Sequence, residues 1–371
     1  MLDMSPKLVP TILHLISSLK IGGAERLLVS TMQAARKFGY PNFVVVVMND
    51  QVDDNLYAEL AATGFPVYRL NRPEGHLHPK YLVSLAKIVR KHGVGVIHSH
   101  NDGSRIWAMA AKLAVPGLKV VYTVHAQGNA EQITGLNRFA YRHLIDATVS
   151  ISTFITEEAR VLSSKRMVQI DNGIDLSKFL NRDRTYSPRL PLRLMQVSRI
   201  TPVKGQDILI DAVKRCRDNG LNISCTFVGV VADKGYFEQL QAQIKRLGLE
   251  NHVRFELNRL DVEVLLAETD IFVLASREEG FGIAIIEAMA ARCPVIVPKV
   301  GGAAEIVTHD FDGLHFETGN TADLVTQITR LANDPVLAEK LARHASETVG
   351  RYDICQTLAS KCKLYRDLVQ A

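Results

Sequence analysis

The sequence has few cysteines and a single tryptophan among its 371 residues. The five cysteines are scattered and form no Cys-x-x-Cys pair; they are Cys216, Cys225, Cys293, Cys355 and Cys362. This odd number and irregular spacing exclude a disulfide framework and favour reduced thiols in the cytoplasm.

Long apolar runs are also absent. No segment approaches the run of about 20 apolar residues that a membrane-spanning helix needs, and residues 1–10 lack the apolar core of a secretory signal. We therefore expect a cytoplasmic protein whose contact with a membrane, where it occurs, is peripheral and on the inner face.

The net charge of +5 suits anionic ligands or an anionic membrane. The sequence lacks the clustered basic stripe that is typical of nucleic-acid binding. We expect no nucleic-acid partner.

What the sequence does contain is an alternation of short apolar runs and longer amphipathic segments, which is typical of parallel sheets covered by helices on both faces. Its length predicts two domains. The expected strands include residues 11–16, 43–48, 94–99, 119–125, 147–151, 193–198, 225–230, 253–257, 271–275 and 294–298. The expected helices include residues 24–36, 81–91, 206–219, 237–247 and 281–291.

A polar stretch at residues 176–191 follows the turn sequence Asn172-Gly173-Ile174-Asp175 and interrupts the alternation. We place the domain boundary there, with an N-terminal Rossmann-like domain over residues 1–180 and a C-terminal one over residues 181–352. Residues 353–371 read as a closing helix that packs back toward the N-terminal domain. Ligands of such sheets bind beyond the carboxyl ends of the strands. If the two sheets face each other, the site is the cleft between them.

The strongest motif is the segment 276–290, in which a loop with two glycines joins a strand to a helix that begins near Gly282. A helix start offers free N–H groups and a positive dipole end to a phosphate. Glu279 and Glu287 are spaced so that both can face one site, one carboxylate accepting from sugar hydroxyls and the other from a ribose. The alternative is a capping residue and an exposed helix residue.

Two further loops follow expected strands. The loop 198–205 brings Arg199 and Lys204 to a strand end, where two cations can neutralise a pyrophosphate; alone, they are equally well explained as solvated surface charges. The turn Gly22-Gly23-Ala24-Glu25 opens a helix but lacks the Gly-x-Gly-x-x-Gly spacing of a nicotinamide site.

Histidines at strand ends raise the question of a metal. His98, His100 and His125 match no standard zinc spacing and no acidic ligand accompanies them, so we expect no metal. His98 is interpreted as a packed, hydrogen-bonded residue, and His125 as a hydrogen-bonding group for a sugar donor. The segment Asp310-Phe311-Asp312-Gly313 has an acidic spacing that can hold a metal, but it reads as a tight turn.

Taken together, these motifs resemble those of the large family-4 group of retaining glycosyltransferases with the GT-B fold. The resemblance covers nearly the whole chain and is strongest over residues 192–319. It is carried by seven stretches: Gly22 to Glu25, His98-Ser99-His100, Val124-His125, Asn172 to Asp175, Arg199 with Lys204-Gly205, Glu279 to Glu287, and Gly301-Gly302 with Glu305.

The resemblance implies an α/β, GT-B enzyme that transfers a hexose from a nucleotide-diphosphate sugar, with a UDP-sugar favoured over a GDP- or ADP-sugar and no other cofactor. Arg199, Lys204, His125 and Glu279 would act at the reacting centre. The donor contacts would be Gly23, Arg199, Lys204, Val228, Gly229, Leu257, Asn258, Glu279, Gly280, Phe281, Gly282, Ile283 and Glu287. Asn258 stands where relatives often carry glycine.

For the acceptor, the resemblance points to loops of the N-terminal domain, with candidate contacts at Asn101, Asp102, Arg105 and Gln127. A glycan or a lipid-linked saccharide is the expected acceptor, in the synthesis of a bacterial surface polysaccharide or lipopolysaccharide. The basic, partly apolar segments 80–91 and 136–144 are candidates for contact with an anionic membrane. Two other functions stay open: a nucleotide-sugar epimerase-like enzyme of the same fold, and a non-catalytic nucleotide-sugar binding protein.

Overall fold

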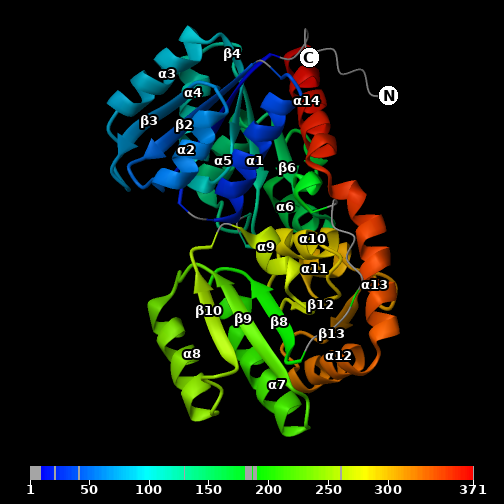
Figure 1. Ribbon diagram of the computed structural model, residues 1–371. Helices are drawn as coiled ribbons and strands as arrows, with labels where there is room; N and C mark the ends of the chain where they lie inside the picture. Colours follow the sequence, from blue (N-terminus) through cyan, green and yellow to red (C-terminus); the bar gives the residue numbers. More distant parts are fainter. Residues whose placement is uncertain are drawn as a thin grey trace. The chain divides into compact units, whose positions relative to one another are not determined.

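The computed structural model describes residues 10–370, apart from positions 21, 41, 129, 180–185, 187–189 and 260. The chain divides into two compact units, and Figure 1 follows it through both from blue to red. Unit 1 comprises Met1–Asp175 together with Ile354–Ala371, and unit 2 comprises Leu176–Asp353.

Unit 1 is built on a seven-stranded sheet in the order β3-β2-β1-β4-β5-β6-β7 with parallel pairing throughout. Its strands are β1 (Thr11–Ile16), β2 (Phe43–Asn49), β3 (Val67–Arg72), β4 (Val94–Ser99), β5 (Lys119–Val124), β6 (Ala147–Ser150) and β7 (Met167–Gln169). Every residue of β2 is buried, and its four consecutive valines suit a strand covered on both faces.

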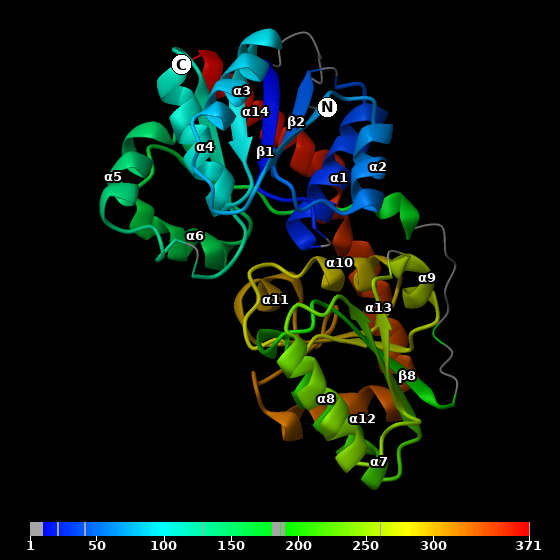
Figure 2. The same cartoon turned by 90° about the vertical axis from the view of Figure 1, so that its left-hand side faces the viewer.

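Helices cover both faces of this sheet. Figure 2 shows α3 and α4 on one face and α1 and α2 on the other. The helices of unit 1 are α1 (Gly23–Lys37), α2 (Asp54–Ala62), α3 (Lys80–Lys91), α4 (Asp102–Ala114), α5 (Gly135–Leu144), α6 (Thr153–Ala159) and the last helix, α14 (Ile354–Gln370).

The last helix, α14, is part of the core of unit 1. It packs on α1 and β4, and Leu358, Leu364 and Tyr365 are buried in the same apolar cluster as the strands β1, β2 and β4. The Tyr365 hydroxyl lies 2.5 Å from Nδ1 of His98, and Thr357 Oγ1 donates to the Asp171 carbonyl over 2.9 Å. The end of the chain thus supplies polar as well as apolar contacts to unit 1.

Unit 2 repeats the same architecture. Its parallel sheet has the order β10-β9-β8-β11-β12-β13. The strands are β8 (Leu192–Val197), β9 (Ile223–Gly229), β10 (Val253–Leu257), β11 (Ile271–Val273), β12 (Val295–Pro298) and β13 (Leu314–Phe316). The helices are α7 (Gln206–Asp218), α8 (Lys234–Arg246), α9 (Val262–Ala267), α10 (Ile283–Ala290), α11 (Gly301–Ile306), α12 (Thr321–Asn333) and α13 (Pro335–Thr348).

The prediction of two α/β, Rossmann-like domains is confirmed. In each parallel sheet the first strand of the unit lies in the interior, and the order of the following strands reverses beside it. The carboxyl ends of β8, β9 and β11 therefore meet at one edge of the unit 2 sheet. In the described part of the chain, no helix has the length and apolarity needed to cross a membrane.

The bond between Tyr365 and His98 gives a test of how α14 is held. Tyr365→Phe removes the hydroxyl and leaves Nδ1 of His98, which is fully buried, without its partner. We expect the free energy of unfolding to fall by about 1–3 kcal/mol, the cost of an unsatisfied buried polar group, as measured by urea denaturation. The matched control is Tyr68→Phe, which breaks a partly exposed bond of 2.8 Å to His92 and should cost less than about 0.5 kcal/mol. Equal losses in the two variants would show that α14 does not depend on this bond.

Candidate functional site

The loop between β8 and α7 carries Arg199 and Lys204 and is tightly folded. Residues Pro202–Lys204 form a single 3₁₀ turn, and Gly205, with φ of 63°, is the N-cap of α7. A Cβ atom at Gly205 would lie 2.0 Å from the carbonyl oxygen of Ala275, closer than any real contact. Only glycine therefore allows this loop to approach the loop that follows β11.

Two buried glutamines fix the backbone of this loop. The side-chain amide of Gln196 donates to the Lys204 carbonyl over 2.7 Å, and that of Gln206 donates to the Arg199 carbonyl over 2.9 Å. Both amides also donate to the hydroxyl of Ser198, and the two residues are only 0% and 1% exposed. The sequence motifs did not single out either glutamine. A signal was present, because Gln196 is an uncharged polar residue inside an otherwise apolar, buried strand end.

The loop after β11 brings Glu279 to Lys204. The Lys204 ammonium donates to Oε2 of Glu279 over 2.8 Å, and the side chains are only 16% and 12% exposed. Ser276 Oγ donates to the same oxygen over 3.3 Å, and the Glu279 carbonyl accepts from the Gly302 N–H over 2.8 Å. The cation and the carboxylate that the sequence placed in separate motifs are thus direct neighbours.

The start of α10 lies beside this pair. Gly282 precedes the helix with φ of 107°, and a Cβ atom there would be 3.6 Å from Cγ of Glu279. Phe281 is buried and packs edge-on against Tyr352, with ring centroids 5.6 Å apart. The first N–H groups of α10, with the positive end of its dipole, are therefore held next to Glu279 and Lys204. Glu287 lies on the same helix and is half-buried.

The other donor residues expected from the sequence lie at the ends of β9 and β10, where Gly229 and Leu257 are paired. Asn258 follows with φ of 59°, and its N–H donates to the Gly229 carbonyl over 2.9 Å. This left-handed conformation is open to glycine and, among other residues, best tolerated by asparagine. Asn258 thus meets a backbone requirement that glycine would also meet.

In unit 1, Gly23 is the first residue of α1, and His125 directly follows β5. His125 belongs to a row of four neighbouring imidazole rings, with ring centroids 4.5 Å apart for His98 and His100 and 5.9 Å apart for His100 and His125. Burial, together with the charge of Lys361, lowers the pKa of His14 and of His125 to about 3. All four rings are therefore neutral near pH 7.

The interpretation of His98 as a packed, hydrogen-bonded residue is confirmed. Besides Tyr365, its ring bonds Thr123 Oγ1 through Nε2 over 2.6 Å. Ring nitrogens of His14, His98 and His100 lie within 4.8 Å of one another, which is close enough to ask whether they hold a metal. Both nitrogens of His98 are already engaged, and Nδ1 of His14 bonds Nε2 of His100 over 2.8 Å. The arrangement fits an internal hydrogen-bond array better than a ligand set.

The reading of residues 310–313 as a tight turn is also confirmed. His309 and Gly313 pair across it, and the Asp310 N–H donates to the Gly313 carbonyl over 2.9 Å. Asp312 accepts from the Thr308 N–H and from Thr348 Oγ1, over 2.6 Å and 3.0 Å. Asp310 pairs with Arg330 over 2.6 Å. The carboxylates of Asp310 and Asp312 are thus both bonded to other groups of the protein.

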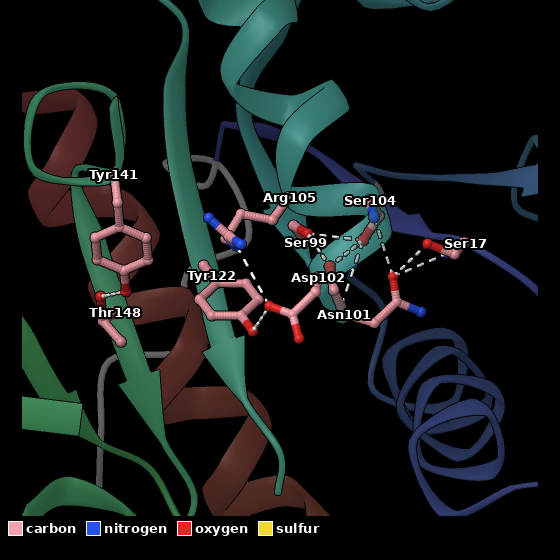
Figure 3. Close-up of polar contacts among 9 residues, drawn as sticks. All are labelled: Ser17, Ser99, Asn101, Asp102, Ser104, Arg105, Tyr122, Tyr141 and Thr148. Atoms are coloured by element: carbon pink, nitrogen blue, oxygen red, sulfur yellow. Dashed lines mark hydrogen bonds and ion pairs between the residues drawn. The ribbon is translucent and has the colours of Figure 1, made fainter. Parts of the chain in front are cut away.

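Figure 3 shows the residues at the start of α4 that the sequence proposed for the acceptor. Asn101 caps the helix, and its Oδ1 accepts from the Ser104 N–H and from Ser17 Oγ. Asp102 Oδ1 accepts from the Tyr122 hydroxyl over 2.7 Å and lies 3.4 Å from Nε of Arg105.

Arg105 itself lies beneath the surface, only 4% exposed, with its guanidinium carbon 5.4 Å and 5.7 Å from the ring centroids of Tyr122 and Tyr141. The half-buried carboxylate of Asp102 is therefore the charged group that this cluster presents. Gln127 lies in the loop after β5, and its buried Oε1 has no hydrogen-bond partner among the described residues. Asn129, a further candidate for contact with the acceptor in the sequence, is outside the described residues.

Comparison with known proteins shows the family and the fold class of the chain. Residues 180–348 match the family model for glycosyl transferases group 1, and residues 21–178 match that for glycosyltransferase family 4. The chain therefore belongs to the group 1 glycosyltransferases of the family-4 type, enzymes that transfer sugars.

Two relatives and one solved structure illustrate the similarity. The UDP-Gal:alpha-D-GlcNAc-diphosphoundecaprenol alpha-1,3-galactosyltransferase of Escherichia coli is 26% identical, over 78% of this chain and 80% of its own length. The N-acetyl-alpha-D-glucosaminyl L-malate synthase of Bacillus anthracis is 26% identical, over 79% and 81%. The HepE protein of Anabaena, crystallised with UDP and glucose, superposes with a TM-score of 0.83 at 23% identity, over 96% of this chain and 99% of its own. The GT-B class predicted from the sequence is confirmed.

The buried histidines of unit 1 predict acid sensitivity. Their pKa values lie below the ordinary value in the folded state, mainly through burial, so the unfolded chain takes up protons first as the pH falls. Their contribution to stability is complete above about pH 6.5 and is lost as the pH falls toward the folded-state values. We expect the free energy of unfolding, measured with urea, to fall below about pH 6.5 by about 1 kcal/mol per pH unit for each histidine.

A variant can separate these histidines from the other titrating groups. His14→Phe should make the dependence of unfolding free energy on pH shallower, whereas His143→Gln, at an exposed position, should leave it unchanged. An unaltered dependence in His14→Phe would mean that other groups cause the acid sensitivity.

Proposed function

We propose that this protein is a retaining, metal-independent hexosyltransferase that moves a sugar from a nucleotide-diphosphate sugar to a hydroxyl of a glycan or lipid-linked saccharide. The observation that carries the proposal is the 2.8 Å pair between Lys204 and Glu279 beside the start of α10. A cation for the leaving group, a carboxylate for the sugar and free N–H groups for phosphate oxygens occur together there.

The chemistry follows from the charges. The bond between the anomeric carbon and the phosphate oxygen breaks, and negative charge builds up on the departing diphosphate. Arg199, Lys204 and the N–H groups of Phe281 to Ile283 compensate this charge, and Lys204 is already held at Glu279 before the reaction starts. Because these groups supply the positive charge, the step needs no divalent ion.

On the other side of the breaking bond, the sugar develops positive charge, which the carboxylate of Glu279 stabilises electrostatically. The acceptor hydroxyl attacks on the face from which the diphosphate leaves and passes its proton to the departing phosphate oxygen, so the configuration is retained. We favour this route over a covalent intermediate on Glu279. His125, whose pKa burial lowers to about 3, is neutral and offers a hydrogen bond to a donor hydroxyl.

The nucleotide is held by the remaining carboxyl ends of the unit 2 strands. Glu287 binds the ribose, Gly280 and Gly282 allow close approach of the diphosphate, and the base lies near Val228, Gly229, Leu257 and Asn258. Gly23 of unit 1 offers its N–H to the distal phosphate. We favour UDP over GDP or ADP, because the Anabaena protein of the same fold was crystallised with UDP and with UDP-glucose.

Unit 1 supplies the acceptor side. Asn101, Asp102 and Gln127 present polar atoms at the carboxyl ends of its strands, and Arg105 orients Asp102 from below. The name of the Escherichia coli relative specifies an acceptor on a diphosphoundecaprenol carrier. This supports a lipid-linked acceptor and a role in making a bacterial surface polysaccharide or lipopolysaccharide on the cytoplasmic side of the membrane.

The experiment compares the wild type with Lys204→Ala and Arg199→Ala in a panel of nucleotide sugars, with thermal shift to detect donor binding and product analysis to detect transfer. We expect a UDP-sugar to raise the unfolding temperature of the wild type, and kcat/KM to fall by about a hundredfold or more in each variant, with far-ultraviolet circular dichroism unchanged. Near-normal turnover in both variants would defeat the proposal. Conversion of the donor without acceptor would instead indicate an epimerase, and binding without any turnover would indicate a binding protein.

Contact with an anionic membrane has its own test at α5. This helix exposes Leu136 and Phe139, by 88% and 63%, beside the basic residues Arg138 and Arg142. An apolar anchor flanked by cations is typical of interfacial helices. We expect the protein to sediment with vesicles containing phosphatidylglycerol, more at low salt than at high salt, and Leu136→Ser with Phe139→Ser to reduce the bound fraction severalfold.

The matched control is Val336→Ser, at an 80% exposed apolar position of unit 2, which should leave sedimentation unchanged. Equal binding to vesicles of neutral phosphatidylcholine, or undiminished binding of the double variant, would rule out this docking surface.

A further inference from the structure

Arg277 lies two residues before Glu279 and has no part in the function proposed above. Two of its hydrogen bonds lead to the neighbouring loop that carries Lys204. The Arg277 N–H donates to the Val203 carbonyl over 2.7 Å, and its Nη1 donates to the Pro202 carbonyl over 2.6 Å. Main chain and side chain of one residue thus hold the 3₁₀ turn Pro202–Lys204 from two sides.

The guanidinium also forms a two-pronged pair with Asp207 in the first turn of α7. Nη1 donates to Oδ1 over 2.9 Å and Nη2 donates to Oδ2 over 2.6 Å. Asp207 in turn accepts from the Tyr236 hydroxyl over 2.6 Å. We call this set of bonds among Arg277, Asp207 and Tyr236, with the bonds from Arg277 to the turn, the loop bridge.

The loop bridge reaches three of the loops at the carboxyl edge of the unit 2 sheet. Arg277 lies in the loop after β11, Asp207 lies in the first turn of α7, which follows β8, and Tyr236 lies in the first turn of α8, which follows β9. Burial alone would raise the pKa of Asp207, but the hydrogen bonds from Arg277 and Tyr236 hold it below its ordinary value. Its carboxylate therefore stays charged and keeps both partners at neutral pH.

The loop bridge could stabilise the whole fold or fix the geometry of the two loops, and the strength of its ion pair distinguishes these roles. The Arg277 side chain is 42% exposed, and exposed ion pairs stabilise a fold by only about 0–1 kcal/mol. A role in global stability is therefore small. A role in geometry is larger, because the arginine fork fixes both the distance and the angle between the two loops.

We propose that Arg277 and Asp207 are positioning residues that hold the loop of Lys204 against the loop of Glu279, so that both side chains stand ready for a nucleotide diphosphate. The inference rests on the proposed function for its ligand, but not for the coupling of the two loops. In this proposal Arg277 affects the substrate by positioning Lys204 and does not contact the substrate itself.

The first experiment needs no ligand. Amide hydrogen exchange of the wild type and of Arg277→Gln is followed by mass spectrometry over segments 198–206 and 274–282. We expect both segments to exchange faster in the variant, by about tenfold, which corresponds to a loss of about 1.4 kcal/mol in local opening. Unchanged exchange in segment 198–206 would overturn the proposal.

A matched control is Arg193→Gln. Arg193 also forms a two-pronged pair with an aspartate, Asp270, over 3.0 Å and 3.1 Å, but at the beginning of β8. Its loss should speed exchange near the amino ends of β8 and β11 and leave segment 198–206 unchanged. If both variants loosen that segment equally, the effect is one of general destabilisation and the loop bridge has no special role.

The second experiment is a double-mutant cycle on UDP affinity, measured by calorimetry with wild type, Arg277→Gln, Lys204→Ala and the double variant. If Arg277 acts through Lys204, Arg277→Gln weakens UDP binding by about tenfold alone but by less than about twofold when Lys204 is already alanine. Arg277→Lys, which keeps the charge but not the fork, should fall between wild type and Arg277→Gln.

The outcomes distinguish a failure of the role of Arg277 from a failure of the proposed function. Equal losses of affinity in both backgrounds would overturn the action of Arg277 through Lys204. A wild type that binds no UDP or other nucleotide diphosphate would defeat the proposed function, while the exchange experiment would still decide on the loop bridge.

Discussion

The contact between the Lys204 ammonium and the Glu279 carboxylate constrains the arrangement of the loops of unit 2. Both groups are largely withdrawn from water, and two charges in that position are tolerable only as a close, hydrogen-bonded pair. The pair forms because two loops approach within contact distance, which requires a residue without a side chain at Gly205. The function we propose implies that a donor diphosphate competes with Glu279 for the ammonium and frees the carboxylate to face the sugar.

The two units share a sheet order but differ in what lines the carboxyl edge. In unit 2 the loops after the strands bring the charged pair of Lys204 and Glu279 together, whereas unit 1 holds a row of four neutral histidines in and directly after its strands. Lys361 of α14 lies near these histidines, and burial lowers its pKa to about 8. The same architecture thus carries a charged pair in one unit and an array of neutral rings in the other.

The sequence predicted the elements and the separate motifs because these depend on local patterns. The valines of β2 and the glycines around Phe281 are visible within a few residues. Edge strands were harder: β3 mixes polar and apolar residues, since it is only half-buried. Contacts between segments distant in the sequence could not be predicted from local patterns. The bond between His98 and Tyr365 joins positions 267 residues apart, and the pairing of Arg277 with Asp207 joins positions 70 apart. In such cases each residue reads alone as an ordinary core or surface residue.

Asn258 shows how the backbone can explain a residue that departs from a family pattern. The resemblance made this position notable because relatives often carry glycine there, and a side chain at the base site would alter the choice of nucleotide. The structure gives a different reason for the residue: with φ of 59°, the chain turns away from β10 in a left-handed conformation, and the N–H still reaches Gly229. Asparagine and glycine both allow that turn. The requirement at this position is therefore one of backbone conformation.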